Sequence, residues 1–316
     1  MLQNLIPPTL LPGATIGIIA PARWPEPAQL ALGVAWLEAQ GFRVKAHPHL
    51  TARDGRLAGS DSVRAAAIND MFADDGVQAV LCARGGTGSF RLLDLIDYDL
   101  IQRRPKILCG FSDLTTLLLA VRQRAGLVTF HGPLLCNFTR ADGHGRTAQD
   151  WRQLLAGQTP AGGKDFTVDA LTPGRAEGAL IGGNLSLLRN LLGTPYDWTA
   201  QDCILFIEDV DEPLYKIDHM LWQLRQAGKF DGVRGVIAGE FTPHADDVNP
   251  APGDVPYGKN LNDLLREYLP RDIPVCTGFP CGHGRYLTSL PVGIRAALEI
   301  SPGHAHLRFL EPVVRV

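Results

Sequence analysis

The chain has 316 residues, 45% hydrophobic and 20% charged, which is ordinary for a folded protein, and this length predicts two domains or one large domain. The net charge of −3 gives no indication of a nucleic-acid partner. No apolar run reaches the ~20 residues of a membrane-spanning helix, and the N-terminus, broken by Pro7 and Pro8, lacks the basic region of a signal peptide. We therefore expect a cytoplasmic protein with no nucleic-acid or membrane partner, whose six cysteines are small core residues.

The first half of the chain alternates apolar strands with helices. Continuous apolar runs predict buried parallel strands, at Ala14–Ala20, Phe42–Ala46, Val77–Cys82, Ile107–Cys109 and Leu127–Phe130. Helical patterns lie between these strands, at Gln29–Gln40, Ser60–Ala73, from Arg91 and from Leu114. This alternation predicts an α/β domain with a Rossmann or flavodoxin-like parallel sheet that helices cover on both faces.

Turn-forming clusters interrupt the alternation between about Thr139 and Gly174, around one short expected helix at Ala148–Ala156. We interpret this segment as a crossover between an N-terminal domain, residues 1–160, and a C-terminal α/β domain, residues 161–316. The second domain has expected strands at Gly178–Ile181, Ile204–Ile207, Val233–Ala238, Ile273–Cys276 and Ala296–Ile300, and helices at Leu185–Leu192, Lys216–Ala227 and Leu261–Tyr268. Because its last strands have no helices between them, its sheet is predicted to be mixed.

A serine follows the fourth expected strand, in Gly110-Phe111-Ser112-Asp113. A turn here places the hydroxyl above the carboxyl edge of the sheet, where open α/β sheets bind ligands. The next helix offers free backbone N–H groups to a developing oxyanion. The motif is not the G-x-S-x-G elbow, since Leu114 replaces the second glycine. Serine and aspartate are also preferred N-caps, and from this motif alone a structural cap is favoured over a nucleophile.

The glycine-rich sequence RGGTG at residues 84–88 also follows an expected strand. Its glycines permit close backbone approach and suit an oxyanion cradle, although a tight strand-to-helix turn is the simpler explanation. The loop is neither a Walker A loop nor G-x-G-x-x-G. A second glycine motif, Gly253 to Lys259, has the Walker A spacing but ends at Asn260 in place of Ser or Thr, and we attribute it to chance.

Two histidines follow or end expected strands. His131 is explained by a hydrogen bond at a strand end, whereas His283 lies between two glycines, which leave the imidazole accessible, and is the better candidate for a base. Glu208 is brought to the carboxyl end of a buried strand by four apolar residues, as an acid that orients a histidine requires.

Other polar residues have weaker claims to a role. Residues Gly182-Gly183-Asn184 could contact a ligand or simply cap a helix. His144 lies in the polar crossover, which favours a surface position. A metal could be bound by His244, Asp246 and Asp247, but the absence of a third ligand at a helical or H-x-H spacing favours an acidic surface loop.

Eight segments, in order along nearly the whole chain, resemble the LD-carboxypeptidases of bacterial murein recycling, a serine peptidase family that also includes microcin-immunity peptidases. They are IGIIAPA, LAGSDSVRAAAINDMFAD, ARGGTGSFRLLDLIDYDLI, PKILCGFSDLTTL, VTFHGP, IGGNLSLLRNLLGTPY, ILFIEDVDEPLYKIDHML and GFPCGHG. The resemblance implies that Ser112 is the nucleophile, Glu208 the orienting acid and His283 the general base. It also implies an oxyanion hole formed by the backbone amides of Gly86 and Asp113. This assignment reverses the preference for a cap at Ser112.

The resemblance also implies a substrate, the murein tetrapeptide, whose terminal D-alanine is released from meso-diaminopimelate without a cofactor or metal. Arg84, at the mouth of the glycine loop, is a candidate to bind the free carboxylate. Thr87 stands where the family usually has an aromatic residue, most often tyrosine, so packing against the substrate is in question. Because no added aromatic loop for an aminoacyl-nucleotide is evident, we favour the cell-wall function over immunity.

We further expect a homodimer, and an active site to which both domains contribute, because Ser112 precedes the crossover and Glu208 and His283 follow it. Two alternatives of other classes remain open. One is a non-catalytic module that closes on a small ligand, with Ser112 as a cap. The other is a metal-dependent hydrolase that uses the His244 segment.

Overall fold

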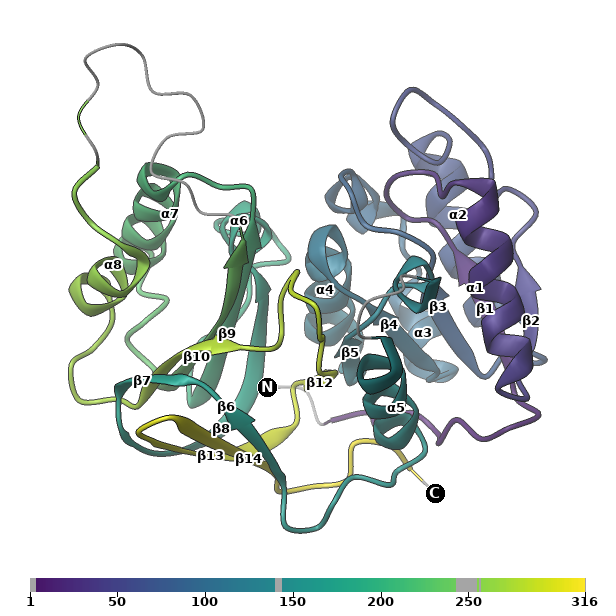
Figure 1. Ribbon diagram of the computed structural model, residues 1–316. Helices are drawn as coiled ribbons and strands as arrows, with labels where there is room; N and C mark the ends of the chain where they lie inside the picture. Colours follow the sequence, from purple (N-terminus) through teal and green to yellow (C-terminus); the bar gives the residue numbers. More distant parts are fainter. Residues whose placement is uncertain (1–3, 140–143, 243–254, 256, 316) are drawn as a thin grey trace. The chain divides into compact units, whose positions relative to one another are not determined.

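The computed structural model describes residues 4–139, 144–242, 255 and 257–315 (Figure 1). The chain forms two compact units. The first contains the described residues of 4–159, 285–294 and 311–315, and the second contains the described residues of 160–284 and 295–310. Among the described residues, no helix combines the length and the apolar character needed to cross a membrane.

The first unit is built on a six-stranded sheet with the order β12-β5-β4-β3-β1-β2. Its strands are β1 (Thr15–Ile19), β2 (Arg43–Ala46), β3 (Ala79–Cys82), β4 (Ile107–Gly110), β5 (Thr129–His131) and β12 (Leu290–Val292). The first five are parallel, in the flavodoxin-like order, and only β12 is antiparallel to its neighbour. Every residue of β3 and β4 is buried, which explains why these strands are continuous apolar runs. The predicted parallel sheet is confirmed.

Helices and short 3₁₀ turns connect the strands of this unit. They are α1 (Pro27–Ala39), α2 (Asp61–Ala73), η1 (Ser89–Leu95), α3 (Tyr98–Arg103), η2 (Ser112–Leu114), α4 (Thr115–Ala125), η3 (Leu135–Thr139) and α5 (His144–Leu155). Helix α2 begins where the Ser60 side chain accepts a hydrogen bond from the Val63 amide. Its Met71 packs over β1, with the sulfur 2.7 Å from the point where a Cβ on Gly17 would lie. A glycine in the middle of β1 therefore allows the helix to approach the sheet closely.

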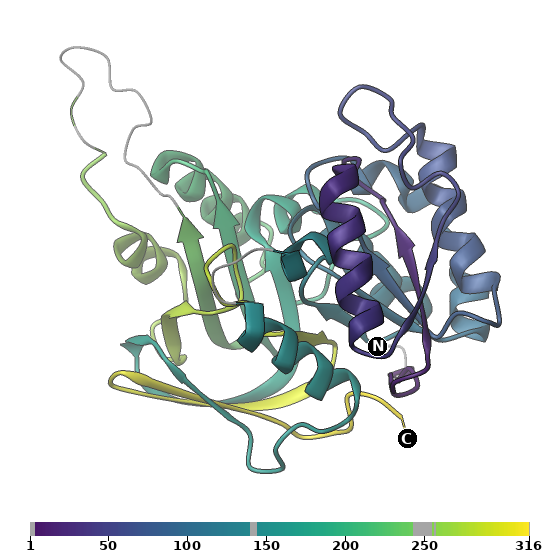
Figure 2. The same cartoon turned by 45° about the vertical axis from the view of Figure 1, so that its right-hand side comes forward.

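The second unit contains an eight-stranded sheet with the order β6-β14-β13-β8-β9-β10-β11-β7. Its strands are β6 (Lys164–Thr167), β7 (Asp169–Thr172), β8 (Gly174–Asn184), β9 (Cys203–Val210), β10 (Val233–Thr242), β11 (Val275–Phe279), β13 (Arg295–Ser301) and β14 (His304–Phe309). Strands β8 to β11 are parallel and the others antiparallel, so the predicted mixed sheet is confirmed. Figure 2 shows the hairpin of β13 and β14 in yellow. Helices α6 (Leu185–Asn190), α7 (Leu214–Gln226) and α8 (Leu261–Tyr268) complete the unit.

The segment 139–174 is more regular than the sequence indicated. Helix α5 begins at His144, four residues before the expected start, and β6 and β7 lie where only turns were expected. The interpretation of these residues as loops around one short helix is therefore wrong for the described part. Strands β6 and β7 occupy the two ends of the sheet, where exposed polar residues are tolerated. They consequently lack the apolar run that marks a buried strand.

Candidate functional site

Ser112 occupies a strained turn between β4 and α4. Its φ of +63° lies in the left-handed region, which costs a residue with a side chain about 1–2 kcal/mol. The N-cap residues of η2 and α4 are Phe111 and Leu114, so Ser112 does not occupy either N-cap position. Strain of this kind is concentrated at functional sites. The turn therefore supports a chemical role for the half-buried Ser112 side chain.

The glycine loop lies directly beside this turn. A Cβ on Gly85 would lie 3.3 Å from the Ser112 Cβ and 3.4 Å from its Oγ. The backbone amide of Ser89, at the end of the loop, donates a 2.9 Å hydrogen bond to the buried carboxylate of Asp113. Burial raises the pKa of this carboxyl, although the hydrogen bonds from Ser89 lower it. The structure thus brings the Ser112 turn and the loop of residues 84–88 together at the carboxyl edge of one sheet.

Within this loop, Gly86 and Thr87 are exposed and Arg84 is half-buried. Gly86 has a φ of +128°, which favours glycine, so its backbone is presented in a conformation that other residues rarely adopt. An exposed backbone in a loop that adjoins the Ser112 side chain is suited to donate hydrogen bonds to an oxyanion.

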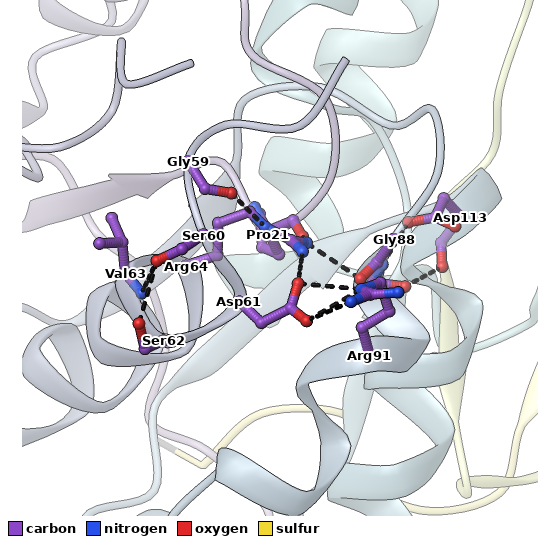
Figure 3. A network of polar contacts seen from close by, with 11 residues as sticks. Pro21, Gly59, Ser60, Asp61, Ser62, Val63, Arg64, Gly88, Arg91 and Asp113 are labelled. Atoms are coloured by element: carbon purple, nitrogen blue, oxygen red, sulfur yellow. Dashed lines mark hydrogen bonds and ion pairs between the residues drawn. The ribbon is translucent and has the colours of Figure 1, made fainter. Parts of the chain in front are cut away.

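A buried arginine supports the glycine loop through hydrogen bonds, a role that no sequence motif predicted. Arg64, in α2, is only 2% exposed. Its guanidinium donates hydrogen bonds to the carbonyl oxygens of Gly88 at 2.9 Å and Gly59 at 3.2 Å, and also to that of Pro21 (Figure 3). Asp61 pairs with Arg64 and with Arg91. Arg64 therefore ties the end of β1, the start of α2 and the glycine loop together.

In the second unit, Glu208 and His283 form a close pair. Glu208 is fully buried directly after the apolar run of β9, two residues before the strand ends at Val210. Its Oε2 lies 2.7 Å from the Nδ1 of His283. Burial lowers the pKa of His283, but the hydrogen bond and charge of Glu208 outweigh this effect and hold the pKa above its ordinary value of 6.5. The pair therefore stabilises the imidazolium form.

A second glutamate, Glu240, shapes the loop around His283. Its Oε2 accepts a 3.2 Å hydrogen bond from the Gly282 amide. A Cβ on Gly284 would lie 2.0 Å from its Oε1. The two glycines flanking the histidine are thus required by the close approach of Glu240. Burial raises the pKa of Glu240, and the nearby Glu208 charge raises it further. The sequence signal was available, because Glu240 ends the apolar run of β10 as Glu208 ends that of β9.

Several other candidates have structural explanations. Asn184 caps α6 by accepting from the Leu187 amide at 3.3 Å, and its amide donates to Asp209 at 2.8 Å. His131 is buried at the end of β5, edge-on to Phe111. Asn260, which ends the second glycine motif, forms a capping box with the third residue of α8. The backbone of α5 begins at residue 144. The candidate metal ligands His244, Asp246 and Asp247 lie outside the described residues, as does the start of the second glycine motif.

Family models match both units of the chain. Residues 16–132 match the LD-carboxypeptidase N-terminal domain, and residues 177–298 match the LD-carboxypeptidase C-terminal domain. The first range includes Ser112 and the glycine loop, and the second includes Glu208 and His283.

Individual relatives cover nearly the whole chain. A probable murein peptide carboxypeptidase from Bacillus subtilis is 40% identical, over 94% of this chain and 92% of the relative. The microcin C7 self-immunity protein MccF of Escherichia coli is 27% identical, over 95% of each chain. Among solved structures, the muramoyltetrapeptide carboxypeptidase of Oxalobacter formigenes superimposes with a TM-score of 0.82 at 30% identity, over 95% of this chain and 99% of that one.

Proposed function

Because the chain belongs to the LD-carboxypeptidase family, a family of hydrolases, we propose that it releases the terminal D-alanine from murein tetrapeptides by hydrolysing its bond to meso-diaminopimelate. The resemblance found in the sequence motifs is thereby confirmed at the level of the family. The main structural support for a covalent mechanism is the strained Ser112 beside the glycine loop. The hydrogen-bonded pair of Glu208 and His283 supplies an acid and a base of the required kinds.

In the proposed mechanism, His283 is the general base and Ser112 the nucleophile. The Nδ1 of His283 contacts Glu208, and we assign its Nε2 as the atom that accepts the proton of the Ser112 hydroxyl. The serine Oγ then attacks the carbonyl carbon of the L-centre of diaminopimelate. Glu208 holds the imidazole in the correct tautomer and stabilises the imidazolium that forms. The backbone amides of Gly86 and Asp113 stabilise the oxyanion, each by about 2.7–4 kcal/mol in analogous enzymes.

Collapse of the tetrahedral intermediate breaks the peptide bond. The imidazolium of His283 gives its proton to the leaving nitrogen, and D-alanine departs. Water then hydrolyses the ester on Ser112, with His283 acting again as the base. An exopeptidase must also bind the free carboxylate, and Arg84, at the mouth of the glycine loop, is a candidate for this contact. Thr87, which is exposed beside the cradle, leaves room where the family usually has an aromatic side chain.

The decisive experiment is to incubate the purified protein with a murein tetrapeptide and measure released D-alanine by mass spectrometry. We expect release that survives EDTA and is abolished in Ser112→Ala. A tetrapeptide ending in L-alanine is the matched control for the LD bond. Cleavage of a microcin-type aminoacyl-nucleotide, with the tetrapeptide left intact, would assign the immunity function instead. Loss of activity in EDTA would favour the metal-dependent alternative, and D-alanine release by Ser112→Ala would contradict the serine mechanism.

The proposal also includes a homodimer and a cytoplasmic location. Sedimentation of the purified protein at micromolar concentration tests the first, and fractionation of the producing cells tests the second.

A further inference from the structure

Arg23 follows β1 at the carboxyl edge of the first unit's sheet and lies directly beside the glycine loop. A Cβ on Gly86 would lie 2.8 Å from the Arg23 Cβ and 3.7 Å from its Cδ. The aliphatic part of the arginine therefore passes along the backbone of Gly86, the residue whose amide is proposed to bind the oxyanion. The residue is half-buried, and the Nε of its guanidinium is fully buried.

The backbone around Arg23 is held in place by the neighbouring segment 54–58. Arg23 pairs with Leu57 in an antiparallel bridge, and the Ala58 amide donates a 3.0 Å hydrogen bond to the Ala22 carbonyl. The next residue, Trp24, donates from its indole nitrogen to the Gly55 carbonyl at 3.2 Å. These contacts fix the position from which the Arg23 side chain extends, as a recognition residue requires.

Arg23 also differs from the other arginines of this region in its ion pairs with carboxylates. Arg64 and Arg91 both pair with Asp61. Among the residues that the structure describes, no carboxylate lies within ion-pair distance of Arg23, and its buried Nε has no hydrogen-bond acceptor. Leaving a buried donor unsatisfied is unfavourable, and more so for a charged group. An anionic ligand would supply a hydrogen-bond acceptor for the Arg23 Nε and a negative charge opposite the guanidinium.

We propose that Arg23 binds the free α-carboxylate of the residue that is released, and so makes the protein an exopeptidase. This inference rests on the proposed function. In the substrate, only three covalent bonds separate the scissile carbonyl carbon from that carboxylate carbon. The carboxylate must therefore lie close to the oxyanion donor Gly86, which Arg23 adjoins. The planar guanidinium matches a carboxylate through two parallel hydrogen bonds, which a lysine cannot make.

The test compares two substrates, the tetrapeptide with a free terminal carboxylate and the same peptide with a terminal amide. We expect the wild-type protein to prefer the free acid, and Arg23→Met to lower kcat/KM for the acid by about 10- to 100-fold, the range expected for one charge-assisted contact. For the amide, Arg23→Met should stay within about twofold of wild type, because that substrate has no carboxylate to lose. Arg23→Lys should recover part of the preference. Arg53→Met is the matched control, since Arg53 is exposed and stacks 3.8 Å over the Trp24 ring in the same region.

The outcomes separate this inference from the proposed function. Equal losses on both substrates in Arg23→Met, with an unchanged thermal midpoint, would show that Arg23 only supports the loop and would overturn the assignment. Loss of the preference in Arg84→Met but not in Arg23→Met would assign the carboxylate to Arg84. If the wild-type protein releases neither D-alanine nor its amide, the proposed function itself fails. Labelling of Ser112 by a fluorophosphonate in each variant confirms that the nucleophile remains intact.

Discussion

Replacing Ser112 by glycine should give a more stable protein than replacing it by alanine, with activity lost in both variants. The φ of +63° at Ser112 costs a residue with a side chain about 1–2 kcal/mol, whereas glycine adopts it freely. Ser112→Ala keeps the strain and Ser112→Gly removes it. Part of the gain is lost because glycine increases the conformational entropy of the unfolded chain, which is worth about 0.4–1 kcal/mol. We therefore expect Ser112→Gly to be about 0.5–1 kcal/mol more stable than Ser112→Ala, with both variants inactive.

Thermal unfolding, followed by circular dichroism, measures this difference. For a protein of this size, the expected gain corresponds to a midpoint about 1–4 °C higher for Ser112→Gly than for Ser112→Ala. Ala66→Gly is a control of opposite sign, since Ala66 is exposed in the regular helix α2 and glycine there should lose about 1 kcal/mol. Identical midpoints for the two Ser112 variants, together with the expected loss at Ala66, would refute the argument from strain.

Four further predictions concern the base and the cradle. Glu208→Gln should lower kcat and move the rise of kcat/KM to lower pH, because Glu208 holds the pKa of His283 above 6.5 and the base acts only when neutral; an unmoved pH profile would contradict this. For the same reason, the contribution of the Glu208–His283 pair to the free energy of unfolding is fully present below pH 6.5 and is lost as the pH rises through the raised pKa of His283. The difference in urea unfolding between wild type and Glu208→Gln should therefore be larger just below pH 6.5 than at alkaline pH. Gly284→Ala should reduce kcat at least tenfold, because its Cβ would lie 2.0 Å from the Glu240 carboxylate and would displace the loop that carries His283. Full activity of this variant would show that the loop accommodates the methyl group without displacing His283. Thr87→Tyr should change KM more than kcat, because a side chain on the cradle contacts the substrate without altering the oxyanion donors, and a large fall in kcat alone would argue against that role.

The sequence predicted those parts of the structure that depend on buried runs. The four apolar residues before Glu208 indicated its position at the end of a buried strand, and the two glycines around His283 marked an unusual loop. The strain at Ser112 could not be predicted, because the same residues fit a helix cap. Edge strands such as β7 were missed, because their residues are partly exposed and lack a continuous apolar pattern.

The supporting residues were missed for a different reason. Arg64 and Glu240 act through hydrogen bonds to backbone atoms that are 24 and 42 residues away in the chain. No local pattern encodes such a contact. A charged residue on the apolar face of a helix, or at the end of an apolar strand, was the available signal, and it was recognised at Glu208 alone.

The return of the chain to the first unit has a consequence for how the protein is made. Strand β5 ends at His131, but its neighbour β12 begins only at Leu290. At ~5–20 residues per second, a ribosome needs roughly 10–30 s to synthesise the intervening segment. During that time the edge of β5 has no partner, and an unpaired edge is a template for association with other chains. Release of the newborn chain before Leu290 would therefore leave a first unit with an open edge, and we expect such truncated chains to aggregate or to depend on chaperones.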